Sequence, residues 1–290
     1  MNEIQVYFKE TTDFVNAELK RYMTNDEPLT KGLQESVNYT LFSGGKRIRP
    51  LFCIMAGELL DVSREKLISL ACSVEMIHTA SLIMDDLPHM DDSQVRRGKP
   101  ANHMVYGQDV AALASIGLLT RAYEVVLNDP ILPDDKKTQI VSKLANAVGI
   151  KGMVGGQFVD LKFSDESMEY STLEYIHIHK TASLFVATGT TAAIIGDATE
   201  DETHAVETYA KNLGFAFQVL DDLFDAKGNT EEIGKPVKKD KGNFATLYGE
   251  DKSKKVIDKC TNEAVEAIGI FGRKSDKLIA LGKMLLKRNV

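Results

Sequence analysis

Two aspartate-rich segments constrain this chain more than any other feature of its sequence: DDLPHMDD at residues 85–92 and DDLFD at residues 221–225. Like charges at such short spacing repel one another unless a cation or a proton lies between them. Each segment follows an apolar stretch, SLIM before Asp85 and FAFQVL before Asp221, so the acids emerge from core sequence and do not form an ordinary solvated face. The pattern predicts two carboxylate clusters joined by positive charge.

The expected cation is Mg²⁺. Carboxylate oxygens without a nearby Cys and His cluster suit this ion, which commonly shares its coordination with substrate phosphates. In a helix, Asp221 and Asp225 lie one turn apart on the same face. In the first segment, Pro88 donates no backbone N–H and disfavours helical geometry at the residue before it. We therefore expect the first helix to loosen there, with Asp91 returning toward the face of Asp85.

Composition limits the class of protein. The chain has 290 residues, of which 43% are hydrophobic, which is enough for a sizeable core. The formal net charge is −7 and the basic residues form only short local groups, so nucleic-acid binding is not favoured. Three cysteines without a CxxC pair fit neither a zinc site nor a disulfide framework. With no signal peptide and no apolar run of membrane-span length, we expect a cytoplasmic protein without stable membrane insertion.

Helix-forming patterns run along nearly the whole chain. There are seven prolines and no tryptophan, and apolar residues recur at three- and four-residue spacing. Between residues 65 and 84, for example, Leu67, Val74 and Ile77 belong to one apolar stripe. Strand-like alternation is scarce and no break resembles a long linker. The sequence predicts an all-α protein with one domain over residues 1–290.

Three basic segments add the charge that the acids lack: GGKRIRP at residues 44–50, RRGKP at residues 96–100 and KPVKKDK at residues 235–241. Arg offers a planar fork that grips phosphate oxygens bidentately, whereas Lys supplies a mobile point charge. Gly44 and Gly45 would let the backbone approach a ligand closely. Taken singly, each segment is an ordinary surface loop, but together with the acids they predict a phosphorylated substrate.

These motifs resemble the trans-type polyprenyl diphosphate synthases, the family that includes farnesyl and geranylgeranyl diphosphate synthases. The resemblance extends to EMIHTASLIM before the first acids, GGQFVDL at residues 155–161, HKTASL at residues 179–184 and GKPVKKDK, all in the family's order. It implies a single polyprenyl synthase domain with the isoprenoid synthase fold, an all-α helical bundle around a deep central cavity. It also implies a homodimer.

The resemblance also implies which residues form the site. Isopentenyl diphosphate would be held by Lys46, Arg49, His78 and Arg97. The allylic diphosphate would be held by Arg96, Lys180, Lys235 and Lys241. Mg²⁺, three ions in the family, would bind Asp85, Asp86, Asp91, Asp221, Asp222 and Asp225. Thr181 and Gln218 match positions close to the allylic carbons, and these two join the aspartates and Lys180 as the expected catalytic residues.

The expected reaction is a trans condensation of isopentenyl diphosphate with an allylic diphosphate. Fixed cations around the leaving diphosphate favour ionisation, because they stabilise the charge that develops in the transition state. No side-chain nucleophile is needed, since the released diphosphate removes the final proton in this family. Among the histidines only His78 is expected to be functional, whereas His89, His103, His177 and His179 are expected to be solvated or packing residues.

Product length is read from the residues one helical turn before Asp85. These are Ser81 and Ala80, both small, with Ile77 another turn down. Small side chains there leave room for a longer tail, so we expect geranylgeranyl diphosphate, with farnesyl diphosphate as the alternative. Two further alternatives are a terpene cyclase of related fold and a non-catalytic regulatory subunit. The intact DDLFD and GGKRIRP segments argue against the cyclase, and the retained aspartates argue against the subunit.

Ala80→Phe should shorten the product spectrum, because an aromatic ring at this position would block the path of the growing chain. The measurement is chromatography of the products made from dimethylallyl and isopentenyl diphosphates. An unchanged spectrum would place the pocket floor elsewhere, at Ile77 or at residues such as Leu113, Ile116 and Leu118.

Overall fold

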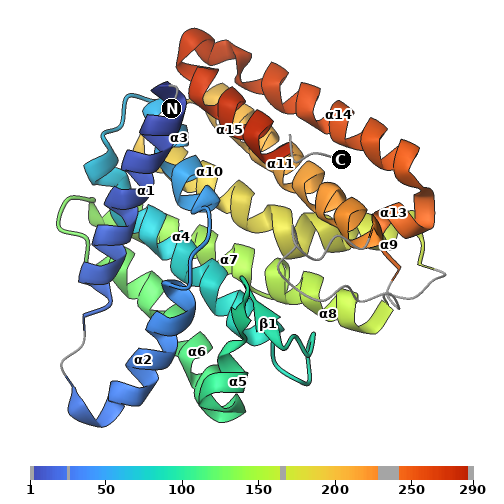
Figure 1. Cartoon of the computed structure of the whole chain (residues 1–290). Helices are drawn as coiled ribbons and strands as arrows, with labels where there is room; N and C mark the ends of the chain where they lie inside the picture. Colours follow the sequence, from blue (N-terminus) through green and yellow to red (C-terminus); the bar gives the residue numbers. More distant parts are fainter. Residues whose placement is uncertain (1–2, 25–26, 164–167, 228–241, 287–290) are drawn as a thin grey trace. The chain divides into compact units, whose positions relative to one another are not determined.

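The computed structural model describes residues 3–24, 27–163, 168–227 and 242–286 (Figure 1). Within these ranges the chain is almost wholly helical, which confirms the predicted all-α class. The described strands are two short pieces, β1 (Val95–Arg96) and β2 (Lys99–Pro100), paired antiparallel with Val95 opposite Pro100. This small hairpin carries the RRGKP segment.

The helices alternate with short connections along the chain. The first half contains α1 (Glu3–Tyr22), η1 (Pro28–Thr30), α2 (Lys31–Leu41), α3 (Ile48–Glu58), α4 (Arg64–Asp85), α5 (Asn102–Tyr106) and α6 (Gln108–Leu127). The second half contains α7 (Asp134–Val148), α8 (Met153–Phe163), α9 (Tyr170–Ile176), η2 (His177–Ala182), α10 (Ser183–Ile195), α11 (Glu200–Lys227), α13 (Phe244–Tyr248), α14 (Glu250–Ala267), η3 (Ile268–Ser275) and α15 (Asp276–Leu286). The described residues group into two compact units.

The first unit holds α1, α2, α5, α6 and most of α4, drawn from Met1–Leu51 and Ile68–Ile131. Buried polar side chains tie its helices together. Asn102 at the start of α5 accepts a hydrogen bond from the Ser36 hydroxyl of α2 and donates to the Ser36 carbonyl and to Thr40 Oγ1, each over 2.8 Å. Arg121 of α6 donates to the carbonyl oxygen of Tyr22, the last residue of α1. These hydrogen bonds satisfy the buried polar groups of Asn102 and Ser36 and join α2 to α5.

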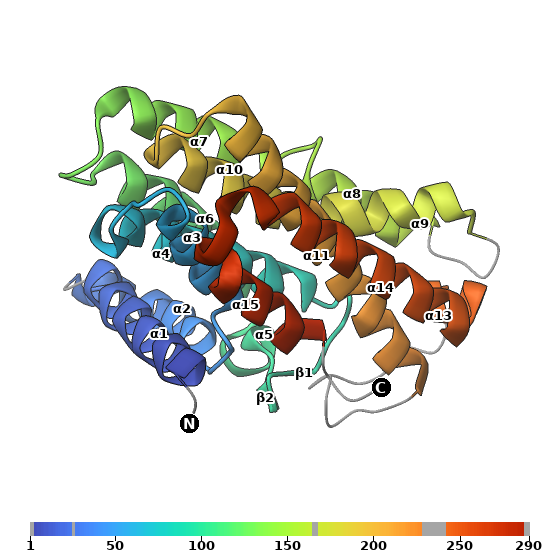
Figure 2. The same cartoon turned by 90° about the horizontal axis from the view of Figure 1, so that it is seen from above.

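The second unit holds α7 to α15 together with Phe52–Leu67. Its longest helix, α11, packs against α10, α14 and η2, and α14 runs alongside it (Figure 2). Aromatic rings fill the core: Phe52 stacks on Tyr209 at 5.7 Å between centroids and meets Phe185 at 6.0 Å. The buried Tyr209 hydroxyl donates to the Leu278 carbonyl of α15 over 2.6 Å. This rigid core carries the second aspartate segment, which lies at the end of α11.

Two helices, α4 and α6, are long and apolar enough by composition to cross a membrane, which the sequence analysis did not anticipate. In α4, 78% of the most apolar window is buried inside the protein, as in the core helix of a globular protein. In α6 the buried share is only 39%. The described part of α6 therefore leaves several apolar side chains, among them Leu113 and Ile116, exposed.

Candidate active site

The first aspartate segment begins where α4 ends. The helix stops at Asp85, and the chain then turns so that the Asp91 N–H donates to the Asp85 carbonyl over 2.8 Å. This closure confirms the predicted loosening at Pro88 and the return of Asp91. The carboxylates of Asp85 and Asp91 both stay partly exposed.

Asp86 has a different environment from its neighbours. Its side chain is buried, and Arg96 of β1 grips it through Nε, 3.0 and 3.1 Å from the two carboxylate oxygens, and through Nη2. Burial raises the pKa of Asp86, and the Arg96 guanidinium opposes that rise. Arg96, which was expected to hold the allylic diphosphate, is therefore already engaged by the aspartate segment. The pair attaches the RRGKP hairpin to the end of α4.

The two basic segments of the first unit lie against each other. Arg97 Nη1 donates to the Gly44 carbonyl over 2.6 Å. Gly45 has a φ of +115°, and a Cβ built there would lie 2.9 Å from the Arg97 guanidinium carbon. Only glycine satisfies both conditions, since the left-handed backbone and the close approach exclude a side chain. The side chain of Arg97 therefore packs directly against the backbone of Gly44 and Gly45.

A buried carboxylate that the sequence analysis did not select organises this basic group. Glu75 of α4 accepts from Arg47 over 2.6 Å, and both side chains are almost fully buried. Arg47 also donates to Asn16 and to the Leu41 carbonyl, while Arg97 approaches the same Glu75 oxygen at 4.0 Å. A buried ion pair of this kind is satisfied only when all its partners are present. Glu75 thus balances part of the charge that the arginines bring together.

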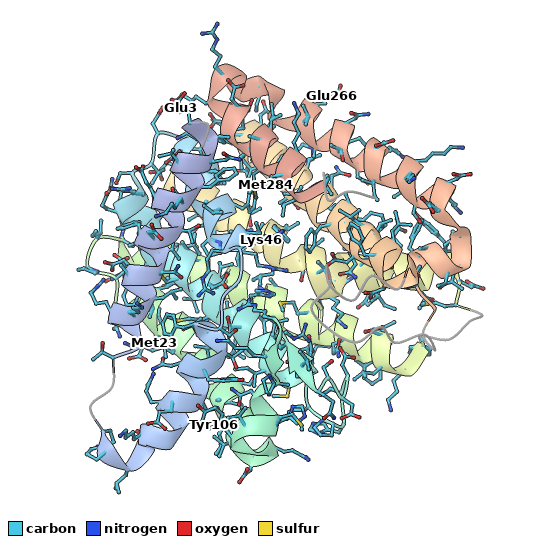
Figure 3. All side chains as sticks on the ribbon, viewed as in Figure 1. Glu3, Met23, Lys46, Tyr106, Glu266 and Met284 are labelled. Atoms are coloured by element: carbon cyan, nitrogen blue, oxygen red, sulfur yellow. The ribbon has the colours of Figure 1, made fainter. Side chains whose placement is uncertain are left out.

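His78 lies one turn beyond Glu75 on α4. Burial lowers its pKa well below the usual value, and the positive charges of Arg49, Arg97, Arg96 and Arg47 lower it further. His78 is therefore neutral at physiological pH and can donate one hydrogen bond to a ligand oxygen. The structure thus brings Arg49, His78 and Arg97 together, as predicted, whereas Lys46 is exposed on the segment leading into α3 (Figure 3).

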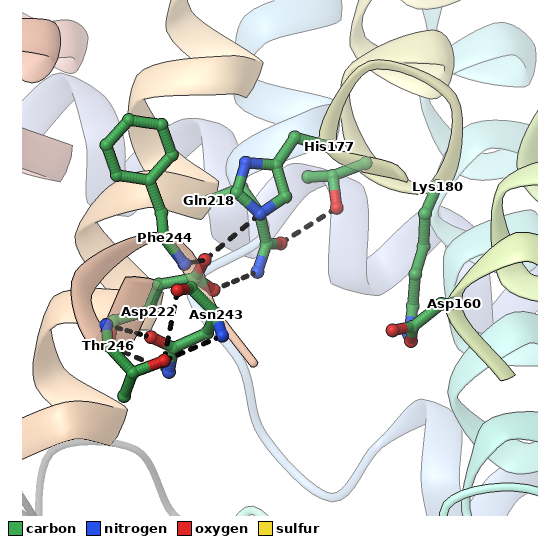
Figure 4. A network of polar contacts seen from close by, with 9 residues as sticks. Asp160, His177, Lys180, Gln218, Asp222, Asn243, Phe244 and Thr246 are labelled. Carbon is green, nitrogen blue, oxygen red and sulfur yellow. Dashed lines mark hydrogen bonds and ion pairs between the residues drawn. The ribbon is translucent and has the colours of Figure 1, made fainter. Parts of the chain in front are cut away.

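The second aspartate segment lies in the last turns of α11. Asp221 and Asp225 are partly buried and one helical turn apart. Asp222 between them is buried and has three donors (Figure 4). They are Gln218 Nε2 at 3.1 Å, the Phe244 backbone N–H at 2.9 Å and His177 Nε2 at 3.0 Å.

Lys180 and Thr181 lie on η2, which is a turn of π-helix, a form that often occurs at functional sites. Lys180 Nζ binds Asp160 of α8 at 2.7 Å, and the Thr181 hydroxyl donates to Gln218 Oε1 at 2.8 Å (Figure 4). Gly156 permits this arrangement, because a Cβ there would lie 2.3 Å from the Lys180 backbone nitrogen. A Cβ at Gly214 of α11 would lie 2.8 Å from Ala182 Cα. The turn is therefore held between two helices that approach it at glycines.

The donor set suits Mg²⁺. Asp85 and Asp91 in the first segment, and Asp221 and Asp225 in the second, are partly exposed residues, although one carboxylate oxygen of Asp225, Oδ1, is buried. Mg²⁺ is usually bound through one or two carboxylates with substrate phosphates and water completing the shell, so two such groups per segment fit this ion. Within the described ranges no three His, Cys, Asp or Glu side chains gather as a preformed metal cage.

The predicted chain-length residues lie on the buried side of α4. Ala80 and Ile77 are buried, and the Ala80 carbonyl accepts from Ser115 of α6 at 2.8 Å. Ser81 is partly exposed, and its hydroxyl donates to the His78 carbonyl. Of the substitute pocket-floor residues, Leu118 is buried, whereas Leu113 and Ile116 are 57% and 54% exposed and so do not line an interior pocket of this chain. Lys235 and Lys241 lie outside the described residues.

Two residues that contact the predicted site residues were not selected from sequence, Asp160 and Glu75, and His177, expected as a solvated or packing residue, is buried and also contacts Asp222. Asp160 lies within the GGQFVDL segment, whose position before the Lys180 segment is the signal that was available. Glu75 and His177 lie on helical stretches and looked like ordinary helix residues. Their partners, Arg47 and Asp222, are far away in sequence, so only the fold reveals them.

Comparisons with known proteins agree with this geometry. A family model described as polyprenyl synthetase matches residues 30–261. Geranylgeranyl pyrophosphate synthase 3, chloroplastic, of Arabidopsis thaliana is 40% identical over 297 residues, covering 99% of this chain and 82% of the relative. Geranylgeranyl diphosphate synthase of Cyanophora paradoxa is 38% identical over 291 residues, covering 98% of this chain and 96% of the relative.

Solved structures are similar over almost the whole length. The geranyltransferase of Legionella pneumophila has a TM-score of 0.89 and 32% identity, with 99% of each chain covered. The geranyltransferase of Helicobacter pylori, complexed with magnesium and isoprenyl diphosphate, has a TM-score of 0.89 and 26% identity, again with 99% of each chain covered. These matches confirm the all-α fold predicted from the sequence.

Gly156→Ala should displace η2 and with it Lys180, because the new methyl group has no space beside the Lys180 backbone. We expect a loss of stability of about 1–3 kcal/mol, the usual cost of overpacking, together with loss of activity. Denaturant unfolding measures the first and product formation the second. Gly32→Ala is the matched control, since a Cβ on Gly32 of α2 meets nothing within 4 Å and should leave stability unchanged or slightly raised. Equal behaviour of the two variants would contradict the close approach.

Proposed function

This chain belongs to the polyprenyl synthetase family, and on that premise we propose that it is a trans-prenyltransferase that condenses isopentenyl diphosphate with an allylic diphosphate to give geranylgeranyl diphosphate. The observation that carries the proposal is the full-length similarity to geranylgeranyl diphosphate synthases, with both aspartate segments intact. The site geometry adds a neutral histidine among arginines in the first unit and a fixed lysine in the second.

The allylic diphosphate is proposed to bind with Mg²⁺, three ions by family resemblance. When bound, Mg²⁺ neutralises the diphosphate oxygens and so makes the diphosphate a better leaving group. By family resemblance, Asp85 and Asp91 of the first segment and Asp221 and Asp225 of the second are the proposed ligands, and each of these residues is partly exposed. The homologous Helicobacter pylori geranyltransferase was solved with magnesium and isoprenyl diphosphate, which supports this choice of ion.

Asp86 and Asp222 also belong to the proposed metal-binding segments, but we propose that they support the neighbouring carboxylates instead of binding the ions directly. The Asp86 carboxylate is held by Arg96, and both oxygens of Asp222 already accept hydrogen bonds. Groups that orient metal ligands in this way matter nearly as much as the ligands themselves. We therefore assign to these two residues the task of fixing the helix ends from which the neighbouring carboxylates project.

The remaining diphosphate oxygens are proposed to meet basic side chains. Lys180 is the cation of η2 directed at the allylic diphosphate, and Asp160 holds its ammonium group in place until the substrate competes for it. Lys235 and Lys241 keep this role by resemblance alone. Thr181 and Gln218, hydrogen-bonded to each other, would flank the allylic carbons. Fixed positive charge favours departure of the diphosphate because the charge it stabilises grows in the transition state.

Isopentenyl diphosphate is proposed to bind at Lys46, Arg49, His78 and Arg97. Arginine forks grip phosphate oxygens in pairs, and neutral His78 adds one hydrogen bond without adding charge. When no anion is bound, the Glu75 carboxylate offsets the repulsion between Arg47 and Arg97. Water must be excluded while the two substrates react, since a free allylic cation would be hydrolysed.

Geranylgeranyl diphosphate is the proposed product because Ala80 and Ser81, one helical turn before Asp85, are both small residues. Farnesyl diphosphate remains the alternative, since a farnesyl/geranylfarnesyl diphosphate synthase of Zymomonas mobilis has a TM-score of 0.89 with 28% identity. We propose that residues 1–290 form one functional synthase domain. Cytoplasmic location without stable membrane insertion is likewise proposed, although the Arabidopsis relative is named as chloroplastic.

A homodimer is proposed to form through α6. The outward face of this helix presents Leu113 and Ile116 next to Gly117 and Thr120, all exposed. Such a flat apolar face suits a second copy of the same helix, since small residues between larger ones let two helices approach closely.

Asp85→Asn and Asp221→Asn should each lower kcat by at least about a hundredfold while leaving the fold intact, because each change removes charge from a proposed metal ligand. The assay incubates purified protein with Mg²⁺, isopentenyl diphosphate and each of dimethylallyl, geranyl and farnesyl diphosphates, and sizes the products by chromatography. Asp258→Asn, an exposed change on α14, is the control. The wild-type protein failing to condense any pair would overturn the proposed function, and near-normal turnover in either variant would overturn the assigned ligand.

Ile116→Glu should convert the dimer to a monomer, because it places two like charges in an apolar interface. Sedimentation equilibrium measures the state directly. Leu29→Glu is the control, since Leu29 of η1 is 94% exposed and belongs to an element far from α6 in sequence. A dimer that persists unchanged in the Ile116 variant would show that α6 does not form the interface.

A further inference from the structure

The sequence predicts His177 as a solvated or packing residue, but in the structure it also contacts a carboxylate of the second aspartate segment. Its Nε2 lies 3.0 Å from Asp222 Oδ2, and both side chains are buried. Its ring packs against Phe215 at 5.5 Å and Phe244 at 6.3 Å between centroids. We propose that His177 is a positioning residue for the condensation: it fixes Asp222, and through Asp222 it fixes the amide of Gln218 and the hydroxyl of Thr181. The proposal rests on the proposed synthase function.

Asp222 is held by donors from two other elements, α13 and η2. The Phe244 backbone N–H donates to Oδ2 at 2.9 Å, and a backbone N–H cannot act as an acceptor. His177 donates to the same oxygen from the other element, η2. An ionised carboxylate only accepts, so each neighbour of Asp222 has to present a donor. Asp222 thus joins α11, α13 and η2 through directional bonds (Figure 4).

The direction of the Asp222 hydrogen bonds also sets the orientation of Gln218 and Thr181. Because Asp222 Oδ1 accepts from Gln218 Nε2, the Gln218 amide turns its oxygen toward Thr181. The Thr181 hydroxyl hydrogen is committed to that oxygen, so Thr181 presents lone pairs to any ligand beside it. Loss of the His177 donor would leave Asp222 Oδ2 with the Phe244 N–H alone, so the carboxylate would be held less firmly, and with it the Gln218 amide and the Thr181 hydroxyl.

The position of His177 in the chain makes this connection effective. It is the first residue of η2, and Lys180 and Thr181 follow three and four residues later on the same π-helical turn. Gly156 and Gly214 hold the two sides of that turn at close contact. His177 therefore links the segment that carries Lys180 directly to the second aspartate segment.

Packing alone does not explain a histidine at this place. The Nδ1 atom of His177 is buried and has no hydrogen-bond partner among the described residues. A buried polar atom without a partner is costly, and phenylalanine would fill the same aromatic cluster without that cost. The residue is kept for the bond that its other nitrogen makes.

The test compares His177→Phe, which keeps an aromatic ring without a donor, with His177→Gln, which restores a side-chain N–H donor near the Nε2 position. In the Phe variant we expect kcat to fall about 10- to 100-fold with the KM for isopentenyl diphosphate unchanged. We expect the Gln variant to recover most of that loss. The exposed His204→Phe on α11 is the control and should match the wild type.

A second readout does not depend on turnover. Binding of inorganic pyrophosphate in the presence of Mg²⁺, measured by titration calorimetry, should weaken about tenfold in the Phe variant and recover in the Gln variant. Melting temperatures should stay within about 3 °C of the wild type. If the Phe variant does not fold, Asp222→Asn combined with His177→Gln replaces it and should show no loss beyond that of Asp222→Asn alone.

The inference is overturned by a folded Phe variant with wild-type kcat and pyrophosphate binding, or by a folded Gln variant that recovers neither. It is also overturned if the combined variant loses more than Asp222→Asn alone. These outcomes are distinct from failure of the proposed function, in which the wild type would condense no substrate pair. In that case the calorimetric comparison of pyrophosphate binding would still test the positioning role of His177.

Discussion

Repulsion between neighbouring carboxylates is the constraint on which this structure depends. Consecutive aspartates at a helix end cannot all be buried, and an unpaired buried charge costs too much to retain. The protein resolves the conflict in the same way twice. The second aspartate of each segment, Asp86 and Asp222, is buried and neutralised or hydrogen-bonded by protein groups, whereas Asp85 and Asp221 remain partly exposed. Buried partners therefore fix the helix ends from which Asp85 and Asp221 project.

Neighbouring basic side chains also repel one another, and here carboxylates offset that repulsion. Arg47 and Arg97 approach one another because Glu75 lies between them, and His78 remains neutral beside them. On η2, Asp160 holds Lys180. Arg97 and Lys180, which are proposed to meet diphosphate oxygens, thus each lie beside a carboxylate in advance, which reduces the reorganisation needed when an anionic substrate binds.

How much could be predicted depended on where the partner of each residue lies. The Asp85 and Asp91 closure could be predicted because Pro88 acts locally on the backbone. The grouping of Arg49, His78 and Arg97 was predicted through ordered motifs that resemble a family. The roles of Glu75 and His177 could not, because their partners lie 28 and 45 residues away in sequence. The placement of Leu113 and Ile116 stayed open in the sequence, since helical periodicity defines a face of the helix but not the direction in which that face points; the structure shows both residues exposed.

The sequence by itself determined the helical class, the identity of the acidic and basic segments and the family, since these follow from periodicity, composition and short motifs. Only the tertiary structure decided which of the aspartates are buried, which cation each one meets and which histidine is connected to the site. The physical reason is that burial and hydrogen bonding depend on neighbours from other helices. Close approaches such as Gly156 on Lys180 and Gly214 on Ala182 bring those neighbours together, and no local pattern records them.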